Sequence, residues 1–193
     1  MNENITIRDD NLSFIEIKSV MDKAHGEAKN DKLDFPTSSL SVEDLENSYK
    51  KNGKWFVACD NNKIVGTICA FKTTINTWYF SGEVLNLKYV AILPEYSGRH
   101  IVSKLYNAVF EYARKFNIQL CIMSMSEYNY HHRHVAEKNK FILTDFFAVK
   151  GLKNYSLTYT FWINDNCPHS KLKIKIMMGL RKIKAKIKRI ILK

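Results

Sequence analysis

The sequence lacks several features that would assign it to a familiar class at once. Its four cysteines, Cys59, Cys69, Cys121 and Cys167, do not have the spacing of metal ligands, and no serine–histidine–aspartate or metal-binding pattern stands out. The first residues show neither the basic nor the apolar part of a secretory signal, and no apolar run approaches the roughly 18–20 residues that span a bilayer. The sequence therefore predicts a soluble, intracellular protein without a bound metal, whose cysteines act as small apolar side chains in a reducing compartment.

Acidic residues are absent from the C-terminal segment. Residues 170–193 carry ten lysines and arginines, whereas the other 169 residues carry 20 basic and 19 acidic side chains. Ten of the eleven net positive charges therefore belong to this segment, and a partner that is selected by positive charge is expected to bind there. Because 46% of the residues are apolar, we expect one packed domain, residues 1–165, followed by a tail, residues 166–193.

The periodicity of the apolar residues predicts a mixed α/β fold with the order β-α-α-β-β-β-α-β-α-β-β. Ser41 and Asp44 predict a capped helix start, and Gly53 is expected to end that helix. Asp60, Asn61 and Asn62 predict a turn that joins two strands into a hairpin. The expected strands are residues 4–8, 54–60, 63–73, 83–92, 118–126, 142–151 and 155–163, and the expected helices are residues 12–30, 41–52, 101–116 and 131–141.

The stretch "VAILPEYSGRHIVSKL", residues 90–105, carries the most informative pattern. An apolar strand runs through a Pro-Glu-Tyr turn into an amphipathic helix, and Gly98 is the only glycine at the junction. The unpaired N–H groups at the start of such a helix, together with its dipole, bind phosphate groups. Such loops usually contain more glycines, because the backbone must approach the phosphate and adopts positive φ angles. An ordinary strand-to-helix turn without a ligand is the alternative.

Two motifs in this order resemble the GNAT N-acetyltransferase superfamily. The family's pyrophosphate loop reads Gln/Arg-x-x-Gly-x-Gly/Ala after Pro-Glu-Tyr, and "PEYSGRHIV" matches its lead-in, Gly98 and the basic residue that follows. Ser97, His100 and Val102 depart from the family pattern, so the loop is degenerate. A second match, "NYHHRHVAEKNKF", places Asn129, the Glu137-Lys138 pair and Phe141 at the spacing of the family's second helix motif. The resemblance covers roughly residues 5–163.

The resemblance implies a mostly antiparallel sheet of six or seven strands with helices on both faces. It also implies acetyl-CoA, or another acyl-CoA, as the cosubstrate. The backbone of the strand at residues 90–92 would pair with the pantetheine arm, and one N–H there would polarise the thioester carbonyl. The implied cosubstrate-binding residues are Val90, Ala91, Ile92, Ser97, Gly98, Arg99, His100, Ile101, Val102 and Asn129.

The catalytic groups implied by the resemblance are incomplete. The family often places a glutamate base where this chain has Asn86, which cannot accept a proton, while Glu83 lies near and would act through water. The family's tyrosine acid corresponds to Ala136, and His132, one helical turn earlier, is the candidate that replaces it. The alternatives are a polar helix surface formed by the histidines at 131, 132 and 134, an acid among Ser126, Tyr128 and Tyr130, or a reaction that needs no acid. The lone residues His25 and His169 are assigned to the surface.

The tail predicts a basic amphipathic helix. Its apolar stripe, Ile176, Leu180, Ile183, Ile187 and Ile190, follows a 4-3-4-3 spacing, and lysines at 182, 184, 186 and 188 flank it. Such a helix suits an anionic membrane surface, whereas nucleic acid would need only the basic face. The other alternative is docking on the body of the protein or on a second subunit, as in a homodimer.

The resemblance therefore predicts a cytoplasmic N-acetyltransferase, held at the inner face of the membrane by its tail. Its acceptor is an amine of a sugar nucleotide, another small molecule, a lipid precursor or a polypeptide. A non-catalytic acyl-CoA-binding module and a nucleic-acid-associated acetyltransferase that acts on charged tRNA are the alternatives.

Overall fold

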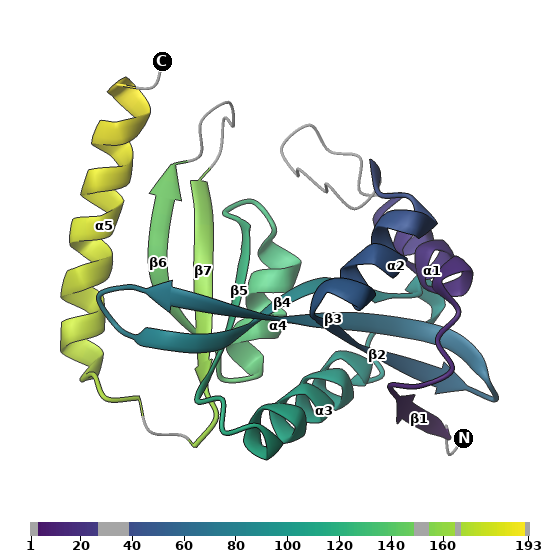
Figure 1. Ribbon diagram of the computed structural model, residues 1–193. Helices are drawn as coiled ribbons and strands as arrows, with labels where there is room; N and C mark the ends of the chain where they lie inside the picture. Colours follow the sequence, from purple (N-terminus) through teal and green to yellow (C-terminus); the bar gives the residue numbers. More distant parts are fainter. Residues whose placement is uncertain (1–3, 27–38, 149–154, 165–166, 192–193) are drawn as a thin grey trace. The chain divides into compact units, whose positions relative to one another are not determined.

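The computed structural model describes residues 4–26, 39–148, 155–164 and 167–191 (Figure 1). Two compact units make up this part of the chain. The first contains residues 4–26, 39–73 and 85–117, and the second contains residues 74–84, 118–148, 155–164 and 167–191. The predicted helix residues 27–30, the predicted strand residues 149–151 and the predicted boundary between residues 165 and 166 lie outside the described residues.

The first unit is built on strands β1 (Ile5–Arg8), β2 (Gly53–Asp60), β3 (Lys63–Asn76) and β4 (Ser81–Ile92), of which β3 and β4 extend into the second unit. β2 is antiparallel to both β1 and β3. Asp60 pairs with Lys63, and the two residues between them, Asn61 and Asn62, have φ angles of 46° and 70°. Two left-handed residues in a two-residue loop form the turn that matches the twist of a hairpin, which confirms the predicted hairpin.

Helices α1 (Phe14–Gly26), α2 (Val42–Lys51) and α3 (Ile101–Lys115) complete the first unit. The capping box predicted for Ser41 and Asp44 is present, since each side chain accepts the backbone N–H of the other residue. The prediction that Gly53 ends α2 is wrong. The helix ends at Lys51, and its C-cap residue Asn52 has a φ angle of 144° and donates its N–H to the Ser48 carbonyl. Gly53 is instead the first residue of β2. A Cβ at this position would lie 2.8 Å from the Ser48 carbonyl oxygen, which explains why the residue is a glycine.

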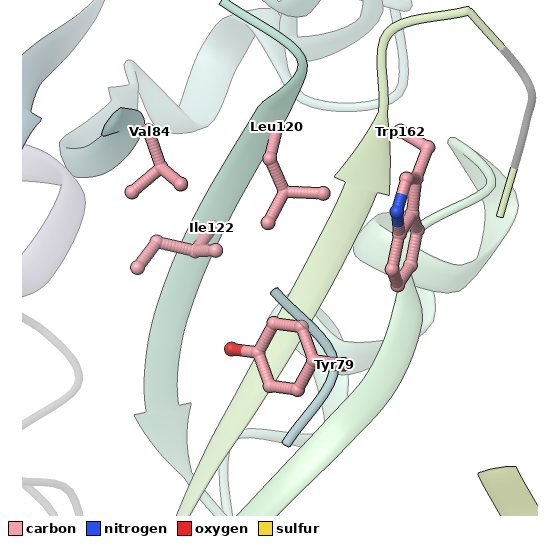
Figure 2. Packing of buried hydrophobic residues seen from close by; sticks show 5 residues of the cluster. All are labelled: Tyr79, Val84, Leu120, Ile122 and Trp162. Atoms are coloured by element: carbon pink, nitrogen blue, oxygen red, sulfur yellow. The ribbon is translucent and has the colours of Figure 1, made fainter. Parts of the chain in front are cut away.

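The second unit contains β5 (Leu120–Ser126), β6 (Ile142–Ala148), β7 (Tyr155–Trp162), α4 (Tyr130–Lys138) and α5 (Lys171–Ile191). β7 lies between β5 and β6 and is antiparallel to both. An apolar cluster gathers side chains from β5, from β7, from the start of β4 and from the segment that joins β3 to β4 (Figure 2). Its buried members are Tyr79, Val84, Leu120, Ile122 and Trp162.

Helix α5 packs against β6, as Figure 1 shows for the yellow helix beside the green strand. Ile174 and Ala185 are buried, and Arg181 Nη1 lies 3.6 Å from the Asp145 carboxylate of β6. The predicted apolar stripe is not part of this contact, because its five members remain between 53% and 74% exposed. No helix in the described part of the chain combines the length and the apolar character that crossing a membrane requires.

The fold is therefore mixed α/β, with seven strands in a mostly antiparallel sheet and a C-terminal helix, as the sequence predicts. The order of strands and helices is also the predicted one. The predicted Pro-Glu-Tyr turn between β4 and α3 is a short 3₁₀ helix, Pro94–Tyr96.

Candidate functional site

The last part of β4 changes its backbone conformation at Tyr89. This residue has a φ angle of 56°, which is rare and costly for a side chain of its size. Its ring stacks on Trp55 with a centroid distance of 5.4 Å and meets the edge of Phe71 at 5.9 Å. A left-handed residue inside a strand redirects the backbone groups that follow it, as at a β-bulge. The redirected backbone groups belong to Val90, Ala91 and Ile92. No pattern in the sequence predicts this change of direction.

Gly66 on β3 permits the close packing of the end of β4. A Cβ at this position would lie 2.6 Å from Ile92 Cδ1 and 3.3 Å from Ile101 Cγ2. The Leu93 N–H, just after the strand, donates to the Val65 carbonyl at 2.9 Å. β3 therefore holds both the end of β4 and the start of α3.

The Pro94–Tyr96 turn is anchored to the β2–β3 hairpin. The Tyr96 hydroxyl donates to the Asp60 carboxylate at 2.8 Å, and Lys63 Nζ lies 3.9 Å from Glu95 Oε1. These contacts fix the position from which the next loop starts. They give the Pro-Glu-Tyr lead-in a structural purpose that does not depend on a ligand.

The loop of residues 97–100 leads into the N terminus of α3, which no side chain caps. Gly98 and His100 both lie in the left-handed region, with φ angles of 79° and 58°. α3 begins at Ile101, and no side chain caps it. The first N–H groups of an α-helix have no partner within the helix, and its positive dipole end attracts anions. The loop therefore has the backbone form of a diphosphate-binding turn, with a histidine in a conformation that favours glycine.

Arg99 is folded back onto this turn. Its guanidinium donates to the Glu95 carbonyl at 2.9 Å and lies 4.7 Å from the centroid of the Tyr96 ring. The side chain is exposed, and in this position its charge lies beside the Pro94–Tyr96 turn.

Replacing His100 by glycine is expected to preserve or improve the loop. A left-handed residue other than glycine costs roughly 1–2 kcal/mol, which exceeds the roughly 0.4–1 kcal/mol that glycine loses through the entropy of the unfolded chain. We expect an unchanged or slightly higher free energy of unfolding in urea, and equal or tighter binding of coenzyme A by calorimetry. His100→Ala, which keeps the Cβ but removes the imidazole, is the control. A large loss of affinity in both variants would identify the imidazole as a ligand.

The candidate residue His132 lies on α4 in the second unit, and Asn129 is the N-cap residue directly before that helix. The Asn129 side chain caps the helix by accepting the His132 N–H at 3.1 Å. His132 is half-buried with its Nε2 atom shielded from solvent, and Ala136 is fully buried. His131 and His134 are exposed. The polar-surface interpretation therefore suits these two residues, whereas His132 and Ala136 share the inward face.

Glu137 of the second motif ties α4 to β7. It accepts the Tyr159 hydroxyl at 2.8 Å, and Arg133 Nε donates to the same hydroxyl oxygen at 3.3 Å. Arg133 also reaches the Glu127 carbonyl at 3.0 Å. Burial is the main reason why the pKa of Tyr159 is raised, so this hydroxyl keeps its proton and remains a donor to Glu137. The glutamate of the motif has a positioning role in this fold.

The two remaining catalytic candidates lie on β4. Glu83 is exposed and belongs to the second unit, whereas Asn86 is half-buried and belongs to the first. Within the described residues, no group of three or more histidine, cysteine, aspartate or glutamate side chains is arranged to hold a metal ion.

The assignment of His25 and His169 to the surface is wrong, because both are half-buried. The His25 ring, on the last turn of α1, hydrogen-bonds to the backbone of Val90. Burial is the largest influence on this ring and lowers its pKa below the usual value. His169 stacks on Trp78 at 5.3 Å between ring centroids. Sequence patterns miss both residues because their partners are distant in the chain.

A hollow opens beside the last turn of α1. It is lined by Asp22, Lys23 and Gly26 of the helix and by Pro94 and Glu95 of the turn after β4. His25 lies within the same turn of α1, and Val90 precedes the same Pro94–Tyr96 turn. The hollow therefore adjoins the end of β4, within the first unit.

A family model and several solved structures both relate this chain to GNAT acetyltransferases. The model of the acetyltransferase (GNAT) family matches residues 19–141. A structure from Desulfovibrio desulfuricans, described as of the GNAT family, has a TM-score of 0.68 at 12% identity and covers 82% of this chain and 99% of that chain. The ribosomal-protein-S18-alanine N-acetyltransferase of Escherichia coli has a TM-score of 0.61 at 13% identity, with 82% and 94% covered.

A third solved structure carries a ligand. The Salmonella typhimurium protein yncA, solved with its cofactor acetyl-CoA, has a TM-score of 0.61 at 12% identity and covers 84% of this chain and 95% of that chain. At these identities the likeness shows the fold. No curated protein matches the chain by sequence.

Proposed function

Because the chain belongs to the GNAT acetyltransferase family, we propose that it is an N-acyltransferase that moves an acetyl group from acetyl-CoA to an amine. The observation that carries this proposal is the backbone of residues 89–102. It combines a redirected strand end, a loop with two left-handed residues and the uncapped start of α3. Another acyl-CoA has the same diphosphate and would bind the same loop and helix. These elements therefore do not select the length of the acyl chain.

The end of β4 binds one part of the cosubstrate, and the loop with the start of α3 binds another part. Backbone groups of Val90, Ala91 and Ile92 pair with the pantetheine arm like an added strand, and one N–H polarises the thioester carbonyl. The first-turn N–H groups of α3 bind the diphosphate. The loop supplies Ser97, Gly98, Arg99 and His100, and the helix supplies Ile101 and Val102. Asn129 contributes at the start of α4, beside its capping role.

Proton transfer involves three candidate residues. Glu83 takes a proton from the acceptor through water, and Asn86 orients that water, because an amide cannot itself accept the proton. His132 donates a proton to the departing thiolate. Its place on the inward face of α4, shared with Ala136, supports this role, since Ala136 stands where the family has a tyrosine.

The acceptor is an amine of a small molecule or of a polypeptide. The Escherichia coli enzyme named above acetylates the alanine of a ribosomal protein, which supports a polypeptide acceptor. A sugar nucleotide and a lipid precursor are the small-molecule candidates.

Calorimetry with acetyl-CoA and desulfo-CoA, followed by thiol release over a panel of amines, tests this function. We expect binding of both compounds and amine-dependent release of coenzyme A. Absence of binding would contradict the proposal. Binding without turnover across a broad panel would support the second candidate, a non-catalytic acyl-CoA-binding module. The specific observation in favour of that candidate is buried Ala136 at the position of the family's acid.

The catalytic domain comprises residues 1–165 in this proposal, and residues 166–193 hold it at the inner face of the cytoplasmic membrane. The membrane role is supported by the difference between the two sides of α5, one packed on β6 and the other exposed. At about 100° per residue, the docked residues Ile174, Arg181 and Ala185 lie opposite the exposed apolar stripe. Docking on β6 therefore leaves the stripe available.

Charge favours an anionic lipid surface as the occupant of the stripe. Exposed lysines lie on both sides of it, Lys173 and Lys184 on one and Lys175 and Lys186 on the other. No acidic residue occurs in residues 170–193, so two such helices would repel each other in a homodimer. Nucleic acid would leave the isoleucines in water. An anionic membrane accepts both the apolar side chains and the lysines.

A further inference from the structure

We propose that Trp55 is a positioning residue for acyl transfer: its indole holds Tyr89 in the left-handed conformation and thereby aims the backbone groups of residues 90–92 at the thioester. This role rests on the proposed function, because it concerns the strand end that polarises the thioester carbonyl there. Trp55 lies on β2, Tyr89 lies on β4, and β3 lies between these two strands in the sheet. A side chain two strands away therefore controls the reactive end of β4.

The first argument is the backbone of Tyr89 itself. Its φ angle of 56° lies in the left-handed region, which a residue with a large side chain rarely adopts. Such a conformation persists only where the surrounding contacts hold it, and it is found most often at functional sites. Without such contacts, a tyrosine would return to the extended conformation of the strand. The contacts of Tyr89 therefore keep the strand end in its present form.

The second argument is the contact between the two rings. The centroids of the Tyr89 and Trp55 rings lie 5.4 Å apart with an interplanar angle of 10°, so the rings are stacked. Phe71 of β3 meets the Tyr89 ring edge-on at 5.9 Å. Trp55 is completely buried, and Phe14 of α1 contacts its ring edge-on at 5.7 Å. Because β2 and α1 fix the indole, the indole can in turn fix Tyr89.

The third argument is the space that the sheet leaves for this stack. Trp55 pairs with Cys69 and Gly53 pairs with Phe71, and directly opposed residues of two paired strands point to the same face of the sheet. A Cβ on Gly53 would lie 2.9 Å from Cys69 Sγ and 3.1 Å from Phe71 Cε1. The small residues at 53 and 69 therefore leave room for the two large rings beside Tyr89.

The fourth argument is the indole N–H. Within the part of the chain that the structure describes, Trp55 Nε1 is shielded from solvent and has no hydrogen-bond partner. A buried donor without a partner lowers stability, and a phenylalanine would fill much of the same space without this cost. The unpaired N–H of Trp55 and the strained backbone of Tyr89 meet at one contact. Features that lower stability and occur together are typical of positions kept for function.

The place of Tyr89 in β4 gives the stack its role. Tyr89 directly precedes residues 90–92, so its backbone angles set the direction in which their N–H and carbonyl groups point. At the other end of this segment, the Leu93 N–H donates to the Val65 carbonyl at 2.9 Å. A backbone N–H stabilises charge on a carbonyl oxygen only where it is aligned in advance. The stack on Trp55 provides this alignment at the start of the segment.

The test uses the full-length protein and acetyl-CoA that is isotopically labelled at the thioester carbonyl carbon. Isotope-edited infrared spectroscopy measures the stretching frequency of this carbonyl, which falls when a hydrogen bond polarises it. We expect the wild type to lower the frequency relative to free acetyl-CoA, and Trp55→Leu to lose most of this shift. The Kd of acetyl-CoA, measured by calorimetry, should rise less than about threefold, because the diphosphate binds at the start of α3.

Turnover gives a second readout. With an amine that the wild type acylates, Trp55→Leu should lower kcat by about tenfold to a hundredfold, since a misplacement of about 1 Å at the reacting groups has an effect of this size. A residue that only supported binding of the cosubstrate would change KM instead.

Phe56→Leu is the matched control. Phe56 is the next residue of β2, is also buried, and packs against Tyr112 on the opposite face of the sheet. This change should lower the melting temperature but keep the carbonyl shift. Tyr89→Gly should keep part of the shift, because glycine adopts a positive φ angle without a supporting ring. Adding Trp55→Leu to Tyr89→Gly should then have little further effect. If Trp55→Leu does not fold, Trp55→Phe is compared in the same two backgrounds.

The outcomes separate this role from the proposed function itself. A wild type that does not bind acetyl-CoA contradicts the proposed function. A wild type that shifts the carbonyl frequency, and whose folded Trp55→Leu variant keeps the whole shift, contradicts the role of Trp55. Binding of acetyl-CoA without any shift in the wild type also overturns this role. The same holds if Phe56→Leu loses the shift, or if Trp55→Leu has as large an effect beside Tyr89→Gly as it has alone, since Trp55 would then contribute only general packing.

Discussion

Ser103→Asp, on the first turn of α3, is expected to lower the affinity for coenzyme A at least tenfold while the protein stays as stable as the wild type. A carboxylate at a helix N terminus stabilises the helix by about 0.3–1 kcal/mol. The same carboxylate repels a bound diphosphate, by roughly 1 kcal/mol for unit charges about 4 Å apart in water and by about 4 kcal/mol at an effective dielectric constant of about 20. Affinity for coenzyme A therefore falls, while the free energy of unfolding stays at least at the wild-type value.

Calorimetry and thermal unfolding measure the two quantities. Ser103→Asn has the same shape without the charge and should bind coenzyme A within about threefold of the wild type. Acetyl-pantetheine lacks the diphosphate, so its turnover should be the same in both variants. If Ser103→Asp binds coenzyme A as tightly as Ser103→Asn does, the diphosphate does not bind at the start of α3.

The strands and helices were predictable because their signals are local. The two asparagines of the β2–β3 turn and the capping box at Ser41 each depend on residues a few positions apart, and both are confirmed. The end of α2 was misplaced because an asparagine took the conformation for which glycine is the usual choice. The choice between Asn52 and Gly53 depended on tertiary packing, since Gly53 lies too close to Ser48 and Cys69 to carry a side chain.

The candidate site was predictable only in part. The motif identified the loop of residues 97–100, and the positive φ of His100 follows from its place in that motif. The left-handed conformation of Tyr89 depends on stacking with Trp55 and Phe71, which come from other strands. The contact between His25 and Val90 joins residues far apart in the chain. Neither leaves a periodic signal in the sequence.

For the C-terminal tail, the sequence predicted the helix but not the side by which it packs. The spacing of the isoleucines predicted an amphipathic helix, and α5 is that helix. The stripe was nevertheless a poor guide to docking, because the contact with β6 uses the opposite side, through Ile174, Arg181 and Ala185. Small and mixed residues formed the docking face, and periodicity of large apolar residues does not detect such a face.

Ile183→Ser combined with Ile187→Ser is expected to abolish binding to anionic vesicles without unfolding the protein. Both side chains are more than half exposed in α5, so little packing is lost. Transfer of each isoleucine into an apolar environment is worth about 1.5–3 kcal/mol, so the double variant should lose at least a hundredfold in affinity. Sedimentation with vesicles containing 30% phosphatidylglycerol measures the loss. All-phosphatidylcholine vesicles should bind the wild type weakly, because the lysines then lack their partners.

Ile174→Ser is the matched control on the docked face of the same helix. Because Ile174 is buried against the body of the second unit, this single change should lower the melting temperature, which the double variant leaves unchanged. Binding to RNA, if it occurs, rests on lysines and should survive the loss of the two isoleucines. A wild-type dimer that the double variant converts to a monomer, with no vesicle binding by either, would show that the stripe is a subunit interface. The lysines on its two sides would then need an acidic partner on the second subunit, and residues 170–193 contain none.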